Sequence, residues 1–370
     1  MKILIVQDFL RSGGTERQSV LLAGAFAAAG HASTLVTFRP GGALAGTVPD
    51  SVDHRILQPL DLRLDWLAPR LVATARRLAP DIVLCMGRMA NCYGASLQAA
   101  LPAAAVVGSM RTGKSLPALF RRSLRTVRHV VANSRDARDT LVRRYRVPPD
   151  RISVIYNSLV FPPLPDGPPA GAPVRRTLRA EHGVGPRTRV MACVAMFRPE
   201  KNQRELVEIV AGLDAKLDWQ LWFAGDGSAR AACEKLVAAR GLAARIKFLG
   251  LLRDPTPVYR AADLAVHASS SEALSNFLIE GQAHGLLAVA YDAQGIAECF
   301  VPGRTGWVIP RGDQAAFRAT LSRRLSEPAV AQTERAADAR AFARTTFDPA
   351  RQIRAYLDLF AALSAAPPAR

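Results

Sequence analysis

A short apolar run, a glycine-containing loop and a helical segment follow one another from the first residues, and this unit recurs along the chain. Residues 2–7, KILIVQ, form the first such run. Apolar runs of this length without polar alternation are typical of strands that are buried on both faces of a parallel sheet. The recurrence therefore predicts a doubly wound α/β fold.

The recurrence is interrupted at residues 162–173, PPLPDGPPAGAP, where six of twelve residues are proline. Proline fixes φ and lacks an amide hydrogen, so this linker cannot continue a helix or an interior strand. A chain of 370 residues also exceeds the ~250–300 residues that one core usually supports. We therefore expect one domain at 1–165, a second at 174–347 and a C-terminal helix, 348–370, that packs back on the first domain.

Apolar periodicity, together with the positions of glycine, proline and capping residues, predicts the individual elements. Strands are expected at residues 2–7, 33–38, 82–85, 104–107, 129–132, 150–156, 189–196, 219–224, 246–249, 264–267 and 287–290. Helices are expected at residues 16–29, 134–145, 199–213, 228–240, 255–262, 274–284, 313–326, 331–346 and 349–362.

The net charge of +18 favours an anionic partner, whether a nucleotide, a nucleic acid or an acidic lipid surface. Half of this excess lies at residues 111–151, with twelve Lys or Arg against three Asp. A chain that is rich in arginine throughout would show the same bias without such a partner.

Five scattered cysteines form neither a disulfide framework nor a zinc motif, which indicates reduced, mostly buried thiols in a cytoplasmic protein. The N-terminus reads as a strand and not as a signal peptide, and no apolar run is long enough to cross a bilayer.

Two glutamates, Glu272 and Glu280, enclose seven mostly apolar or small residues. Ser275 and Asn276 are favourable N-cap residues, so the helix is expected to begin near Asn276, with Glu272 in the preceding loop. The amides of a helix N-terminus can bind phosphate, and two nearby carboxylates can accept hydrogen bonds from sugar hydroxyls. On the pattern alone, a solvated Glu272 and a Glu280 that only favours the first helical turn explain the pair equally well.

The residues on both sides of this pair also follow the sequence pattern of a known family. After Glu280, the positions that fit this pattern are Ala283, Gly285, Ala288, Val289, Ala290, Gly295, Glu298, Gly303, Gly306 and Val308. Near the N-terminus, the matching segments are GGTE at 13–16, VVANS at 130–134 and ISVIYN at 152–157. Together these positions resemble glycosyltransferase family 4, whose members are retaining enzymes with the GT-B fold of two facing Rossmann-like domains.

The resemblance implies a donor site that lies mainly in the second domain, while the first domain would bind the acceptor. Glu272 would contact hydroxyls of the donor sugar, and Glu280 would bind the ribose. Backbone amides of the helix start would meet the phosphates, from residues Ser275, Asn276, Phe277 and Leu278.

Arg198 and Lys201, in VAMFRPEKNQ, match the basic pair of the family. Preorganised cations stabilise the charge that develops on a departing diphosphate. Such a pair can take the place of a metal ion, so no metal or other cofactor is expected; a solvated basic turn is the alternative.

Glycines near the predicted strand ends are the remaining donor-site candidates. Gly13 and Gly14, in SGGTERQ, would approach the donor from the first domain, although a glycine pair can equally form an ordinary tight turn. Gly225 and Gly227 follow a predicted strand, and Gly250 begins the loop that usually meets the base in this family.

The chain departs from the family pattern in four places. Ala273 replaces a glycine, Leu287 replaces a proline, and Ser158 replaces the glycine that usually follows Asn157. Residues 106–115 also lack the histidine that many members place beside the donor sugar. The candidates for that space and for an anionic acceptor are Ser109, Arg111 and Lys114.

Residues 115–131 combine an apolar stripe with arginines off the stripe, which predicts a basic amphipathic helix. It could bind an anionic membrane surface, for example the inner face of the cell membrane, or its apolar face could belong to the core.

The resemblance thus implies a glycosyltransferase that moves a sugar from a nucleoside diphosphate sugar to a glycan or lipid-linked acceptor in bacterial envelope polysaccharide synthesis. A sugar-nucleotide epimerase of the same fold is an alternative. Few aromatic residues and no known motif argue against a nucleic-acid-binding protein. The missing GxGxxG spacing argues against a nicotinamide oxidoreductase.

Overall fold

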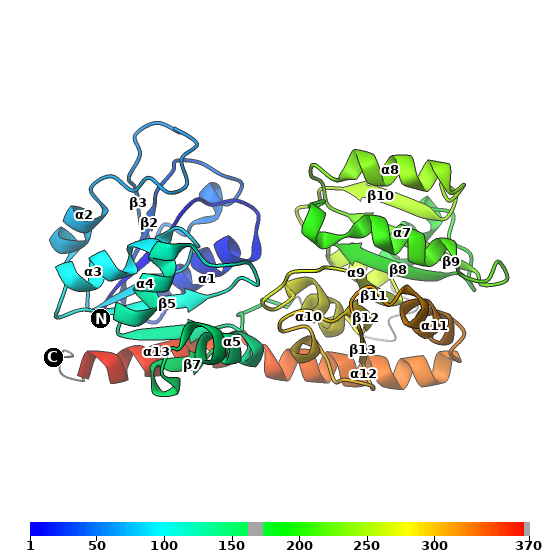
Figure 1. Ribbon diagram of the computed structural model, residues 1–370. Coiled ribbons are helices and arrows are strands. Elements are labelled where there is room, and N and C mark those ends of the chain that lie inside the picture. Colours follow the sequence, from blue (N-terminus) through cyan, green and yellow to red (C-terminus); the bar gives the residue numbers. More distant parts are fainter. Residues whose placement is uncertain (162–172, 366–370) are drawn as a thin grey trace. The chain divides into compact units, whose positions relative to one another are not determined.

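The computed structural model describes residues 1–161 and 173–365 (Figure 1). The chain divides into two compact units, Met1–Ser158 with Phe347–Arg370, and Leu159–Thr346. The boundary between Ser158 and Leu159 precedes the predicted proline-rich linker, which lies outside the described residues except for Pro173.

The first unit is built on a parallel sheet of seven strands in the order β3-β2-β1-β4-β5-β6-β7. The strands are β1 (Lys2–Gln7), β2 (Ala32–Thr37), β3 (Asp53–Ile56), β4 (Ile82–Cys85), β5 (Ala105–Met110), β6 (His129–Ala132) and β7 (Ile152–Val154). The helices are α1 (Gly14–Ala28), α2 (Leu71–Leu78), α3 (Gly94–Ala100), α4 (Ala118–Thr126), α5 (Arg135–Tyr145) and α13 (Pro349–Ala365), with short 3₁₀ turns η1 (Ala45–Thr47), η2 (Ala90–Tyr93) and η3 (Pro149–Arg151).

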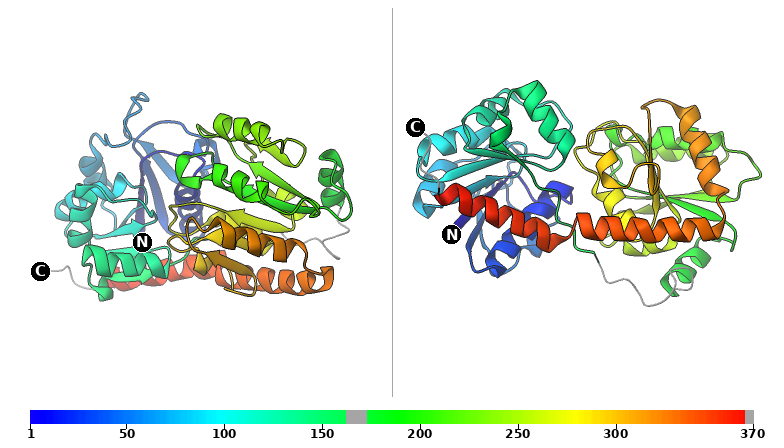
Figure 2. Two further views of the ribbon diagram at one scale, coloured as in Figure 1. Left: turned by 45° about the vertical axis from the view of Figure 1, so that its right-hand side comes forward. Right: turned by 90° about the horizontal axis from the view of Figure 1, so that it is seen from below.

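Helix α13 belongs to this first unit although it is the last element in sequence (Figure 2, red). Tyr356 and Phe360 are fully buried, and their rings lie 6.2 and 5.5 Å from the ring of Phe26 on α1. These aromatic side chains share a core with Ile3 and Ile5 of β1. The C-terminal helix therefore completes one of the two faces of the first sheet.

The second unit contains a parallel sheet of six strands in the order β10-β9-β8-β11-β12-β13. The strands are β8 (Arg189–Val194), β9 (Trp219–Ala224), β10 (Ile246–Gly250), β11 (Leu264–His267), β12 (Leu287–Tyr291) and β13 (Gly306–Ile309). The helices are α6 (Pro173–Glu181), α7 (Gln203–Ala211), α8 (Arg230–Ala239), α9 (Thr256–Ala261), α10 (Asn276–Ala283), α11 (Gln314–Leu325) and α12 (Ala329–Thr346), with 3₁₀ turns η5 (Pro199–Lys201) and η6 (Ala297–Cys299).

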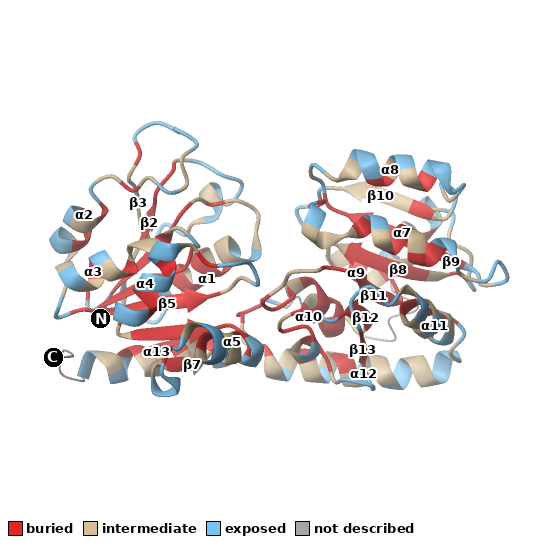
Figure 3. Ribbon diagram, in the orientation of Figure 1, coloured by how far each residue is buried: buried red, intermediate tan, exposed pale blue. Residues whose placement is uncertain are grey.

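The interior strands of both sheets are buried along their length, whereas the covering helices alternate between buried and exposed faces (Figure 3). This burial is expected for parallel strands that are covered on both faces. No helix in the described ranges, 1–161 and 173–365, combines the length and apolar character needed to span a membrane.

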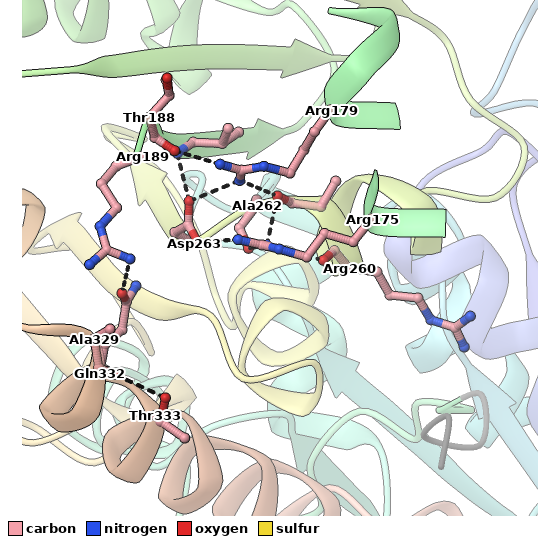
Figure 4. Close-up of polar contacts among 12 residues, drawn as sticks. Arg175, Arg179, Thr188, Arg189, Arg260, Ala262, Asp263, Ala329, Gln332 and Thr333 are labelled. Carbon is pink, nitrogen blue, oxygen red and sulfur yellow. Dashed lines mark hydrogen bonds and ion pairs between the residues drawn. The ribbon is translucent and has the colours of Figure 1, made fainter. Parts of the chain in front are cut away.

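A buried charge cluster fixes α6 to the amino end of the second sheet (Figure 4). Asp263, directly before β11, accepts hydrogen bonds from Arg175 Nη2 at 2.7 Å, Arg179 Nη1 at 3.2 Å and the amide of Val190 at 2.8 Å. Arg179 also donates to the carbonyl of Thr188 at 2.5 Å. Because the carboxylate is paired and fully hydrogen-bonded, its burial is compensated.

Candidate active site

The residues predicted to bind the donor gather at one edge of the second sheet. Arg198 and Lys201 follow β8, Gly225 follows β9, Gly250 ends β10, and Glu272 follows β11. These strands are parallel, so their carboxyl ends lie at the same edge. This edge is where open α/β sheets bind their ligands.

The carboxylate of Glu272 forms a buried ion pair. Its Oε1 atom lies 2.5 Å from Lys201 Nζ and 2.7 Å from His267 Nε2. The contacts that the described residues make with this carboxylate all fall on Oε1. Oε2 is therefore available to a ligand hydroxyl.

Burial acts on both titratable groups of this cluster. It opposes ionisation of Glu272, but the Lys201 ammonium and the hydrogen bond from His267 outweigh it and lower the pKa of Glu272 to about 2. Burial also lowers the pKa of His267 below its ordinary value, although the carboxylate favours the charged form. At neutral pH, a neutral imidazole thus donates Nε2–H to an ionised carboxylate.

Glu280 is held by a side chain from a different element. Tyr259 Oη on α9 donates a hydrogen bond to Glu280 Oε2 at 2.5 Å. The Tyr259 ring stacks on Phe277 at 6.3 Å and lies 5.3 Å from the ring of His284. Both glutamates of the predicted pair are therefore oriented before any ligand binds, which is a requirement for a precise binding site.

Helix α10 begins where the sequence predicts, with Ser275 as its N-cap. The Ser275 Oγ accepts a hydrogen bond from the amide of Leu278 at 3.5 Å. The Leu278 amide, one of the predicted phosphate donors, thus has a partner at the start of the helix.

Two loops of this edge are joined by hydrogen bonds to one backbone carbonyl. The carbonyl of Glu200, between Arg198 and Lys201, accepts from the Ser270 amide at 2.9 Å and from Ser269 Oγ at 3.1 Å. The basic turn is therefore fixed to the loop that carries Glu272.

Gly225 and Gly227 are required by close packing. Their φ values are +145° and +147°, and an added Cβ would collide with the carbonyl oxygens of Ala195 and Phe197. The Gly225 amide also donates to the carbonyl of Gly250 at 2.7 Å. These glycines bring the ends of β8, β9 and β10 together.

Comparison with known proteins agrees with this geometry. Residues 12–159 match the family model described as Glycosyltransferase Family 4, and residues 188–327 match the model described as Glycosyl transferases group 1. The chain belongs to glycosyltransferase family 4. This is a family of transferase enzymes.

The family 4 chain is similar to several curated glycosyltransferases. It is 30% identical over 155 residues to the putative glycosyltransferase EpsD of Bacillus subtilis, which is 42% of this chain and 41% of that protein. It is 31% identical over 128 residues to the lipopolysaccharide core biosynthesis glycosyltransferase LpsE of Rhizobium meliloti, covering 35% and 37%. The chain thus spans less than half the length of these relatives.

Solved structures share the fold over nearly the whole chain. HepE of Anabaena, crystallised with UDP-glucose, superposes with a TM-score of 0.80 at 22% identity, covering 98% of this chain and all of that one. A glycosyltransferase of Rickettsia africae gives a TM-score of 0.82 at 20% identity and covers 99% of each chain. The family 4 chain therefore has the GT-B fold.

The two glycines predicted in the first unit lie at the start of α1. Gly13 is the N-cap residue and Gly14 is the first helical residue. An added Cβ at Gly13 would collide with the Glu16 carboxylate, so glycine lets that carboxylate fold back over the helix start.

The predicted acceptor-side residues need correction, because two of them have structural partners. Strand β5 extends to Met110, so Ser109 is buried, and its hydroxyl donates to the carbonyl of Cys85 at 2.7 Å. Arg111 donates to Asn157 Oδ1 at 2.5 Å and to Tyr356 Oη at 2.6 Å. Ser109 cannot face an acceptor, and Arg111 fixes α13; of the three candidates, only Lys114 is an exposed side chain.

The basic helix predicted at 115–131 is shorter than expected. Helix α4 ends at Thr126 because Val127 is extended and leads into β6. Leu116, Phe120 and Leu124 of the apolar stripe are buried in the core, whereas Leu119 is 60% exposed. The arginines at 121, 122 and 125 remain exposed.

Sequence reasoning missed His267 and Tyr259, which orient the two glutamates. His267 is the last residue of a correctly predicted strand and precedes Glu272 by five positions. A polar residue at the carboxyl end of a buried parallel strand is the signal that could have identified it.

Proposed function

We propose that this protein transfers a glycosyl group from a nucleoside diphosphate sugar, with retention of anomeric configuration, to a glycan or lipid-linked acceptor of the bacterial envelope. The observation that supports this most directly is the carboxylate of Glu272, ionised, buried and engaged through Oε1 alone. Such a group is suited to accept a hydrogen bond from a sugar hydroxyl through Oε2.

The low pKa of Glu272 assigns it a binding role. A carboxylate with a pKa of about 2 is a weak base at neutral pH, so it would not deprotonate the acceptor efficiently. We assign that step to an oxygen of the departing phosphate, with the acceptor hydroxyl attacking from the same face of the sugar. Glu272 would orient the sugar while the bond to the leaving group breaks.

The basic turn would receive the departing diphosphate. Arg198 is exposed three residues before Lys201, whose ammonium has further hydrogens besides the one directed at Glu272. Positive charge held beside the leaving oxygen stabilises the transition state more than the ground state. Glu280 and the amides of Asn276 and Phe277 would hold the ribose and phosphates.

We further propose that the reaction needs no resident metal ion. The guanidinium of Arg198 and the ammonium of Lys201 would supply the positive charge that a metal ion could otherwise provide to the diphosphate. Turnover should be unchanged after exhaustive treatment with EDTA and dialysis. A loss that added Mg²⁺ or Mn²⁺ restores would contradict the metal-free assignment.

The relatives suggest the donor and the acceptor. HepE was crystallised with UDP-glucose, and LpsE is named for lipopolysaccharide core synthesis. We therefore propose a uridine diphosphate hexose as the donor and an envelope glycan or its lipid-linked precursor as the acceptor. With such an acceptor, we propose that the enzyme acts in the cytoplasm at the inner membrane face.

A thermal-shift screen against UDP-, GDP- and ADP-sugars would test this proposal. A ligand at a hundred times its dissociation constant stabilises the native state by about 2.7 kcal/mol, so the UDP-sugars should raise the melting temperature by several degrees and the GDP- and ADP-sugars should not. The Glu280→Ala variant should lose most of that shift. Equal, negligible shifts with every sugar nucleotide would overturn the proposed donor class.

A further inference from the structure

The loop between β3 and α2 exposes an unusual number of large apolar side chains. Four of the nine exposed large apolar residues found in the described ranges lie within residues 56–66. They are Ile56, Leu60 at 70% exposure, Leu62 at 52% and Trp66 at 58%. Figure 3 shows this loop beyond the end of β3, mostly in the colour of exposed residues. We call residues 56–66 the apolar loop.

Polar side chains hold the apolar loop from the inside. Gln58 is fully buried, and its amide donates to the carbonyls of Leu64 at 2.9 Å and Leu67 at 2.7 Å. The loop therefore reverses the usual pattern, since a glutamine is buried while leucine and tryptophan face water.

A buried arginine adds a second anchor. Arg39 binds Asp61 at 2.7 Å and Asp65 at 2.5 Å, and its guanidinium lies 4.0 Å from the ring centre of Phe9. Arg11 also pairs with Asp65 at 2.5 Å, so two arginines balance the charge of the two loop acids. These contacts fix a conformation in which the leucines point outward.

The 3₁₀ turn η2 connects the apolar loop to α4, the most basic helix of the first unit. Tyr93 Oη of η2 donates to the carbonyl of Trp66 at 2.6 Å. On the other side, Ser123 Oγ of α4 donates to the carbonyl of Cys92 at 3.4 Å. Both the apolar loop and α4, with its exposed arginines, therefore rest on the same short turn.

We propose that the apolar loop inserts its leucines and tryptophan into the surface of an anionic lipid bilayer. A fixed set of protruding apolar side chains marks an interaction site, and tryptophan favours the bilayer interface. The loop acids are paired, Arg63 is exposed between two leucines, and the whole chain carries +18. This positive charge favours binding to the acidic headgroups of an anionic bilayer.

The proposal relocates the membrane contact predicted from the sequence. Most of the apolar part of that contact comes from residues 56–66, because the stripe of residues 115–131 is buried except for Leu119. Helix α4 would supply positive charge and the exposed Leu119 side chain. The inference is independent of the proposed reaction, because it requires no donor, acceptor or turnover.

Co-sedimentation with lipid vesicles would test the apolar loop. The full chain is mixed with vesicles of phosphatidylcholine alone or with ~30% phosphatidylglycerol, and the bound fraction is measured at low and high salt. Wild type should bind the anionic vesicles more tightly, and the double variant Leu62→Gln/Trp66→Gln should bind about 30-fold more weakly. Both positions are exposed, so the variant should fold normally.

A matched control and a spectroscopic variant complete the experiment. Leu251→Gln/Val330→Gln removes two apolar side chains of 61% and 73% exposure from the second unit and should leave binding unchanged. Trp66→Phe should still bind but lose most of the blue shift in tryptophan fluorescence that vesicles cause. Equal binding by wild type and the Leu62→Gln/Trp66→Gln variant, or no binding by wild type, would overturn the proposal. So would a wild-type oligomer that this variant converts to monomer, because the loop would then be a protein interface.

Discussion

Asp8 and Glu272 are buried carboxylates at the carboxyl edges of the two sheets, and burial affects them in opposite ways. Asp8 accepts the amides of Met89 at 3.0 Å and Ala90 at 2.5 Å, and burial raises its pKa to about 7. Glu272 is also buried, yet Lys201 and His267 lower its pKa to about 2. The difference is the partner, since backbone dipoles compensate burial less than a nearby cation does.

The same comparison separates a structural carboxylate from a ligand-binding one. Both oxygens of Asp8 bond to backbone amides, and an added Cβ at Gly87 would collide with its carboxylate. Glu272 meets its partners through one oxygen only. Asp8 thus joins β1 to η2, whereas Glu272 keeps one carboxylate oxygen for the donor sugar that we propose.

The largest effect is expected from Glu272→Gln, which keeps the shape of the side chain and removes its charge. Release of nucleoside diphosphate in the presence of acceptor should fall about 1,000-fold, because one preorganised electrostatic contact is typically worth 10²–10³ in rate. Glu234→Gln, on the exposed surface of α8, is the matched control and should retain activity. Wild-type rates in the Glu272→Gln variant would exclude Glu272 from the site.

Removal of the Lys201 ammonium should have the next largest effect. Lys201→Met leaves the buried carboxylate of Glu272 with His267 as its remaining partner. Loss of such a buried ion pair should lower the free energy of unfolding, measured in urea at pH 7, by about 3 kcal/mol. The lowered pKa stabilises the native state above about pH 4.5, and this contribution is lost as the pH falls toward 2. The difference from wild type should therefore shrink over that range. Lys235→Met on α8 serves as an exposed control.

The pH dependence of stability that comes from Asp8 should have the opposite sign to that from Glu272, and Asp8→Asn should remove it. A raised pKa means that the native state binds a proton more tightly, so wild-type stability falls as the pH rises from about 4 through 7. Between pH 5 and 7 this fall should amount to about 2 kcal/mol, from about 1.4 kcal/mol per pKa unit. The variant should show a flatter profile in urea unfolding. An unchanged slope would show that Asp8 does not titrate in this range.

The smallest effect is expected at His267, which positions Glu272 without meeting the substrate. His267→Phe removes the Nε2–H donor, and kcat should fall about tenfold because a hydrogen bond to a charged group is worth about 1.5–3 kcal/mol. His267→Gln restores a donor and should recover most of kcat, with a similar KM for the donor in both variants. Equal losses in both variants would indicate a packing role instead.

The sequence predicts five of the six strands of the second sheet because these strands are mostly apolar, but it misses β13 at Gly306–Ile309. The segments 219–224 and 264–267 coincide with β9 and β11, and α10 begins at its capping serine. Elements without such a signal are missed. β3, DHRI, is polar, α3 begins with Gly94, and α6 follows a proline-rich stretch.

Side-chain partners are predicted less well than element positions. Residues 60–66 alternate apolar and charged side chains, and only the contacts of Gln58 and Arg39 explain why the apolar ones are exposed. Similarly, Ser109 lies beyond the strand predicted at 104–107, but β5 continues to Met110 and buries it. Such outcomes depend on contacts between residues far apart in sequence, which local patterns do not encode.

The position of α13 has a consequence for biosynthesis. The first unit cannot close over Phe26 and Ile3 until residues 347–365 have left the ribosome, long after its seven strands have been made. We therefore expect the nascent chain to expose this aromatic surface during translation, with a need for chaperone protection. A nonsense mutation after Thr346 would make that exposure permanent and lead to aggregation or proteolysis.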